Sequence, residues 1–152
     1  MNRHIRSILV LTAVLFGSSA SAVEVSDPWV RATPPGAKLS AGFLTVKADA
    51  GTPDRLIAVT SPRAGRVEIH ESRMDGEIMR MRALPDGVAV PAEGQVVLAP
   101  GGIHLMLLDL PQPLQTGESI ALTLSFEVAG EVSVEAQVRH PGEMGDEHQH
   151  HH

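Results

Sequence analysis

The sequence predicts an all-β domain, either a β-sandwich or a Greek-key barrel. Three observations support this fold class: short apolar or alternating runs at close spacing, frequent turn-forming residues between them, and no amphipathic stretch long enough for a useful helix. The 152 residues include 11 prolines and 14 glycines, as expected when many short strands are joined by tight turns.

Nine segments alternate in polarity or are continuously apolar, and we predict that each is a strand. In chain order they cover residues 29–31, 41–47, 56–60, 66–71, 77–82, 95–98, 103–108, 119–126 and 131–138. The turns predicted between them are Pro34-Pro35-Gly36, Gly51-Thr52-Pro53-Asp54, Asp75-Gly76, Pro85-Asp86-Gly87, Pro100-Gly101-Gly102 and Ala129-Gly130. In the eighth segment, Leu122 and Leu124 alternate with polar residues, so one face should be buried and the other solvated.

Residues 1–22 have the three parts of a secretory signal peptide. Arg3 and Arg6 form the basic region, Ile8 to Phe16 form the apolar region, and Ala20-Ser21-Ala22 forms the cleavage site. We therefore expect export to the periplasm and a single β-domain over residues 23–139. No second long apolar run follows, so we expect no stable membrane insertion.

The composition excludes several classes of function. The formal net charge is −6, and removal of Arg3 and Arg6 leaves ten basic residues against eighteen acidic ones, a net charge of −8. We expect no nucleic-acid partner, because binding to nucleic acid needs a basic face. The absence of cysteine excludes disulfides, iron–sulfur clusters, thiolate metal sites and blue-copper centres.

Motifs of the common enzyme classes are also missing. The sequence contains no Gly-x-Ser-x-Gly elbow, no His-Glu-x-x-His motif and no phosphate-binding glycine loop. Glu68 and Glu71 flank His70, but they point to opposite faces of a strand and make a poor acid/base pair. We therefore expect no enzymatic activity.

Asp75-Gly76 predicts a two-residue type I′ hairpin, because both residues tolerate the positive φ angles that this turn needs. With these two residues as the loop, His70 lies directly opposite Met81. Directly opposed side chains have Cβ atoms about 4.5–5.5 Å apart, so both could reach one metal ion. Met79 shares this face and is a reserve ligand, and a longer loop would place a different methionine opposite His70.

His104 and Met106 form a second pair of candidate ligands. They are two positions apart on one predicted strand, so both point to one face while Leu105 points to the other. Imidazole and thioether donors suit Cu(I), whereas carboxylates and carbonyls would suit magnesium or calcium. The residues therefore predict a metal site made of His70, Met81, His104 and Met106. Copper held without a thiolate should be easier to pass on.

Residues 140–152 are polar and rich in histidine, so we predict a flexible tail. Its possible ligands are His140, Met144, His148, His150, His151 and His152. These residues could capture Cu(II) or supply an extra ligand to the core site. A native tail and a residual purification tag are both compatible with the last residues.

The chain resembles the PCuAC family of periplasmic copper chaperones over most of its mature length. The family motif is a His, ten residues, a Met, twenty-one or twenty-two residues, and then His-x-Met. Here ten residues separate His70 from Met81, twenty-two separate Met81 from His104, and His104-Leu105-Met106 completes the motif. Further matching stretches are residues 23–31, 41–43, 75–81 and 98–106.

The resemblance implies a cupredoxin-like β-barrel whose exposed site binds Cu(I) through His70, Met81, His104 and Met106. It also implies delivery of copper to the CuA centre of cytochrome c oxidase, with subunit II or a Sco-type copper protein as the partner. We expect a monomer that passes copper on by ligand exchange.

Two other functions are compatible with the sequence. The same site could serve a periplasmic copper buffer, or an uptake or resistance protein with another destination for the copper. A metal-free β-sandwich interaction module is the third hypothesis, and its function would survive replacement of His104 and Met106 by alanine.

Overall fold

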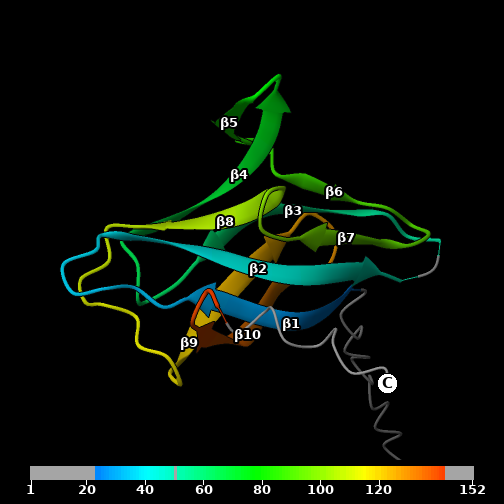
Figure 1. Cartoon of the computed structure of the whole chain (residues 1–152). Helices are drawn as coiled ribbons and strands as arrows, with labels where there is room; N and C mark the ends of the chain where they lie inside the picture. The colour runs from blue at the N-terminus through cyan, green and yellow to red at the C-terminus, as the bar shows by residue number, and fades with distance from the viewer. Residues whose placement is uncertain (1–22, 50, 143–152) are drawn as a thin grey trace, which may run out of the picture.

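A computed structural model describes residues 23–49 and 51–142, and these residues form ten β-strands and no helix (Figure 1). The strands are β1 (Val23–Arg31), β2 (Leu39–Ala48), β3 (Asp54–Thr60), β4 (Arg66–Asp75), β5 (Ile78–Ala83), β6 (Val88–Val90), β7 (Gln95–Leu98), β8 (Ile103–Leu108), β9 (Ser119–Phe126) and β10 (Gly130–Arg139). The predicted signal peptide and the tail beyond Gly142 lie outside the described residues. Nothing in the described part of the chain is a helix that could cross a membrane.

The strands follow the order β5-β4-β8-β2-β1-β10-β9-β3-β6, and β7 pairs with β2. A further pairing between Val59 of β3 and Val67 of β4 closes this sheet into a barrel. Among the described strands, β1 and β10 form the one parallel pair, and the other pairs are antiparallel. The all-β prediction is confirmed, and each of the nine predicted segments overlaps a strand.

Three strands differ most from the prediction, and one of them is β4, which ends at Asp75 rather than residue 71. β1 begins at Val23 rather than residue 29. Asp27 has a φ angle of 45°, and the register with β2 shifts between Ser26 and Trp29. The strand continues through this irregularity, so the residues before it still pair with β2. β6 was not predicted, since three residues are too few for an alternating pattern to stand out. Gly87 precedes β6 with a φ angle of 74°, and a side chain at this position would collide with the carbonyl oxygen of Leu56.

The core lies inside the barrel and is built by residues that alternate along each strand. Leu105 and Leu107 of β8 are fully buried, and Ile69 of β4 is 6% exposed. On β9, Leu122 and Leu124 are also fully buried, and the polar residues Thr123 and Ser125 that alternate with them are partly exposed, as predicted. Burial of a leucine or isoleucine side chain contributes about 1.5–3 kcal/mol relative to exposure. The outer faces of β4 and β8 are therefore free to carry other chemistry.

The β4–β5 hairpin leaves the barrel. The first part of β4, up to Glu71, pairs with β8, whereas the part beyond Ser72 pairs only with β5. Figure 1 shows this hairpin projecting away from the other strands, and every residue of β5 is exposed. Residues at the base of the hairpin therefore lie where β4, β5 and β8 meet.

Candidate metal centre

The hairpin register differs from the prediction by two positions. The loop is Gly76-Glu77 rather than Asp75-Gly76, and Met74 lies opposite Met79. Gly76 has a φ angle of 65° while Glu77 has no positive φ, which fits a type II′ turn with glycine at its first loop position.

The predicted direct pairing of His70 with Met81 is therefore wrong. His70 lies opposite Ala83, and Met81 lies opposite Ser72. A shift of two positions keeps every side chain on its original face, because the side-chain period of a strand is two. Met81 remains a diagonal neighbour of His70, at a separation of about 7–8 Å that long side chains can bridge.

The β4–β8 pairing brings the two histidines together. His70 lies directly opposite His104, and their ring centroids are 5.9 Å apart at an interplanar angle of 56°. Met106 lies opposite Glu68, one step further along the same face. The structure thus places all four predicted ligands, from three strands, on the outer face around the base of the hairpin.

Hydrogen bonds leave one ring nitrogen of each histidine available. His104 Nδ1 lies 3.0 Å from the carbonyl oxygen of Gly102, which can only accept, so Nδ1 donates and Nε2 carries the lone pair. His70 Nε2 lies 2.7 Å from Glu68 Oε2, and its Nδ1 is buried without a hydrogen-bond partner among the described residues. An unpaired buried acceptor is costly, and coordination to a metal ion would satisfy it.

Glu68 holds the His70 ring and is a residue that the sequence analysis did not assign to the site. Its carboxylate also accepts from Arg66 Nε at 3.0 Å. The hydrogen bond from His70, followed by that from Arg66, lowers the pKa of Glu68 below its ordinary value. Glu68 therefore stays an acceptor at neutral pH. Its position two residues before His70 on a strand, and hence on the same face, is the signal that could have identified it.

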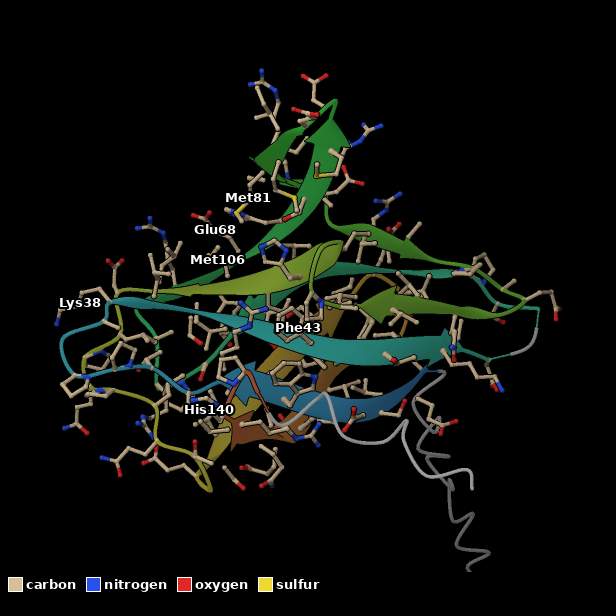
Figure 2. The ribbon with its side chains drawn as sticks, viewed as in Figure 1. Lys38, Phe43, Glu68, Met81, Met106 and His140 are labelled. Carbon is tan, nitrogen blue, oxygen red and sulfur yellow. The ribbon has the colours of Figure 1, made fainter. Side chains whose placement is uncertain are left out.

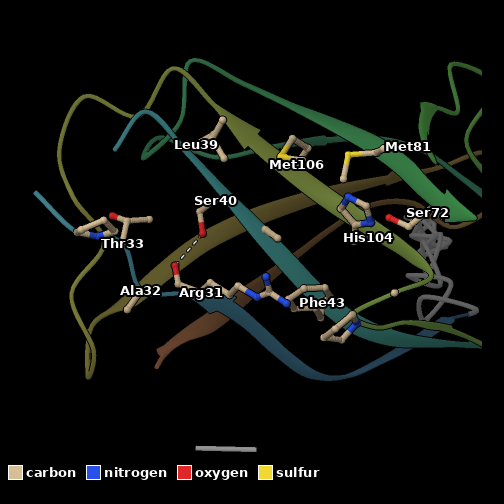
Figure 3. Close-up of a pocket in the computed structure, with 14 residues that line it drawn as sticks. Arg31, Ala32, Thr33, Leu39, Ser40, Phe43, Ser72, Met81, His104 and Met106 are labelled. Carbon is tan, nitrogen blue, oxygen red and sulfur yellow. Dashed lines mark hydrogen bonds between the residues drawn. The ribbon is translucent and has the colours of Figure 1, made fainter. Parts of the chain in front are cut away.

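One cavity of about 300 Å³ is lined by three of the four candidate ligands, Met81, His104 and Met106, but not by His70. Figure 3 shows Met81 and Met106 beside His104, with Arg31 and Phe43 below them. His104 is only 4% exposed, whereas Met81 is 52% exposed. The site is therefore closed around His104 and open to solvent on the side of Met81.

The floor of this cavity comes from strands far from β4 in the chain. Phe43 of β2 is 2% exposed, and the guanidinium of Arg31 on β1 lies 5.3 Å from its ring centroid. The sequence analysis did not assign either residue to the site. Arg31 makes no ion pair among the described residues, so its guanidinium contributes a positive charge beside Phe43.

Other predicted ligands lie elsewhere. Met79 is on the same face as Met81 but one cross-strand pair further from His70, and it is 54% exposed. His140 follows the end of β10, and Figure 2 shows it well separated from Met81. The remaining tail candidates, Met144, His148, His150, His151 and His152, lie outside the described residues.

The described residues offer soft donors and no cluster of carboxylates to a metal ion. Over residues 23–49 and 51–142, no group of three or more His, Cys, Asp or Glu side chains could hold a metal ion. In the same part of the chain, the imidazoles of His70 and His104 share an outer face with the thioethers of Met81 and Met106. Such a set favours Cu(I) over ions that prefer oxygen ligands.

Comparisons with known proteins agree with this description. A family model described as "Putative lipoprotein LpqE-like" matches residues 23–138. A curated protein, "Putative lipoprotein Lxx21020" of Leifsonia xyli subsp. xyli (strain CTCB07), is 34% identical over 110 residues, or 72% of this chain. The match spans 65% of that relative's own length.

Solved structures extend the likeness to the fold. The copper-bound PCuAC domain from PmoF2 is 30% identical, with a TM-score of 0.66 over 81% of this chain and 97% of that domain. Apo-DR1885 from Deinococcus radiodurans is 26% identical, with a TM-score of 0.63 over 94% of this chain and 96% of that protein. The chain therefore belongs to the LpqE-like family, and it is a member of the PCuAC family with the cupredoxin-like fold that the resemblance implied.

Proposed function

We propose that this protein is a periplasmic Cu(I) chaperone whose cargo is held by His70, Met81, His104 and Met106. The observation that carries the proposal is the gathering of these four neutral donors on one outer face, with a free nitrogen on each imidazole. The copper-bound PCuAC domain from PmoF2 supports copper as the metal. The form of DR1885 solved with Cu(I) supports the oxidation state.

The exposure of the ligands suggests the order in which they leave. Met81 is the most accessible of the four, so an incoming thiolate or imidazole of an acceptor protein would displace it first. His104 is buried and its ring is held by Gly102, so it would leave last. Copper stays Cu(I) throughout, and the step exchanges one neutral ligand at a time. We propose no catalytic chemistry for this chain.

The destination of the copper is a further part of the proposal. The PCuAC motif supports the CuA centre of cytochrome c oxidase as recipient, reached through subunit II or a Sco-type protein. The predicted signal peptide supports a periplasmic location. Deletion of the gene should then lower oxidase activity, whereas loss of copper tolerance or import alone would favour a buffering, uptake or resistance role.

Anaerobic Cu(I) titration against a chromophoric chelator tests the site itself. The parent, a chain truncated after His140 and a His104→Ala/Met106→Ala variant should be compared. We expect one tight equivalent in the first two and none in the third. Because His104 is buried, Met106→Leu is a second variant that removes a donor while keeping the apolar volume. Absence of tight Cu(I) binding by the parent would refute the proposal.

A further inference from the structure

The methionines of this chain are not scattered. Of six in the sequence, the four within the described residues are Met74, Met79, Met81 and Met106. Met74 lies opposite Met79, and Met81 is two positions beyond Met79 on β5. By the two-residue period of a strand, these three lie on the same face as His70. One face therefore carries thioethers from the hairpin tip down to the candidate site.

Three of these side chains are highly exposed. Met74, Met79 and Met81 are 60%, 54% and 52% exposed on a hairpin that projects from the barrel (Figure 2). Opposed positions have Cβ atoms about 4.5–5.5 Å apart, and Met81 is a diagonal neighbour of Met74 within the reach of a long side chain. The unbranched methionine side chain can adjust its three torsions to bring sulfur atoms together.

The charges of the hairpin strands belong to its other face. Glu71 pairs with Arg82 at 2.7 Å, and Asp75 pairs with Arg80 at 2.8 Å. These residues alternate with the methionines, so their carboxylates are both neutralised and directed away from the thioethers. The neighbour between Met74 and His70 on the methionine face is Ser72. This face therefore offers little to a hard cation and three donors to a soft one.

We propose that Met74, Met79 and Met81 form an outer Cu(I) site that receives copper before the inner site does. The inference rests on the proposed function, since it adds an entry point to the same inner site. Met81 belongs to both sets: copper held by the three thioethers exchanges Met74 and Met79 for His70, His104 and Met106 while Met81 stays bound. The metal remains Cu(I), and each thioether that leaves is replaced by a neutral donor.

Methionine methyl NMR of the full chain during an anaerobic Cu(I) titration tests this proposal. In the parent, the first equivalent should shift the methyl signals of Met81 and Met106. In His104→Ala/Met106→Ala, which leaves Met81 free for the outer site, Cu(I) should shift the methyl signals of Met74, Met79 and Met81. If Met74→Leu is added to that variant, the response of Met79 to Cu(I) should be lost. The matched control is Ile78→Leu, because Ile78 is 59% exposed on the opposite face of the same hairpin and should leave every methyl response intact.

Loading kinetics give a second readout. In the parent, copper captured by the outer site reaches the inner site at an effective concentration of order mM. Met74→Leu/Met79→Leu lacks this capture, so Cu(I) transfer from a chelator into its inner site should be slower by about tenfold or more. Unmoved Met74 and Met79 signals in His104→Ala/Met106→Ala, or an unchanged loading rate in Met74→Leu/Met79→Leu, would overturn the outer site. In that case shifts at Met81 and Met106 would still support the inner site, whereas their absence would refute the proposed function itself.

Discussion

The two faces of the β4–β8 pair are built from alternating residues of the same strands, yet they differ in every property that matters here. The inner face carries Ile69, Leu105 and Leu107, which are almost completely buried in the core. The outer face carries His70, His104 and Met106. His104 and Met106 line one cavity, and the His70 ring lies beside that of His104. Strand alternation thus allows one pair of strands to stabilise the barrel and present the ligands, so the two roles should be separable by mutation.

Leu105→Ala should have the largest effect, and it should fall on stability. Leu105 is fully buried, and leucine-to-alanine changes at such positions lower the free energy of unfolding by about 2–5 kcal/mol. Urea denaturation of the metal-free protein measures this loss. Val97→Ala is the control, since Val97 is 50% exposed and its truncation should cost within about 0.5 kcal/mol. A loss at Leu105 no larger than that at Val97 would contradict the assignment of the inner face.

Met106→Ala, one residue further along β8, should affect copper binding more than stability. Met106 is only partly buried, so we expect a smaller loss in unfolding free energy than at Leu105. Cu(I) affinity, measured by chelator competition, should fall by more than the roughly 10–100-fold that loss of a supporting group around a metal typically costs. If both neighbouring variants changed stability alone, the two faces would not divide the work as proposed.

The difference between the faces could be predicted from the sequence, because alternation depends only on strand geometry. Alternation placed Leu105 on the core face and His104 with Met106 on the opposite face before any tertiary contact was known. The same period could have identified Glu68. Arg31 and Phe43 could not be found this way, since they reach the site only through the long-range strand order β4-β8-β2-β1.

The prediction of the hairpin register was wrong because it, too, used only local sequence. Two adjacent loop choices around Gly76 are both acceptable to the local backbone, and the predicted one would have placed Leu84 opposite Val67. Val67 is already paired with Val59 of β3, and Leu84 instead donates its N–H to the carbonyl oxygen of Ile69 at 2.8 Å. Leu84 also packs against the core. Packing at the base of the hairpin thus fixes the register, and turn preferences at the tip do not.

Glu68→Ala should weaken Cu(I) binding, but less than the loss of a ligand does. Loss of the carboxylate frees the His70 ring to rotate and to change tautomer, so Cu(I) affinity should drop by about 10–100-fold. Glu71→Ala is the matched control, because Glu71 is nearby on β4 but pairs with Arg82 on the other face. Chelator competition on both variants gives the comparison. Equal losses would mean that Glu68 acts through general charge rather than through its hydrogen bond to His70.

Glu118→Gln should have the smallest effect and should leave copper binding unchanged at neutral pH. Glu118 accepts the backbone N–H of Gln115 at 2.9 Å and lies 3.5 Å from Arg63, and these contacts, with the first the larger, lower the pKa of its carboxyl.

A lowered folded-state pKa adds stability that is present above the ordinary carboxyl range, near pH 4.3, and is lost as pH falls through the lowered value. The parent should therefore lose stability more steeply than Glu118→Gln between about pH 5 and pH 3, as urea midpoints at successive pH values would show. Parallel curves would contradict a stabilising role for this carboxylate. The pKa of Glu68 is also lowered, so the loss of stability at acid pH cannot by itself distinguish the two residues. Cu(I) binding can distinguish them. Only the Glu68 variant should weaken it, because only that carboxylate holds a candidate ligand.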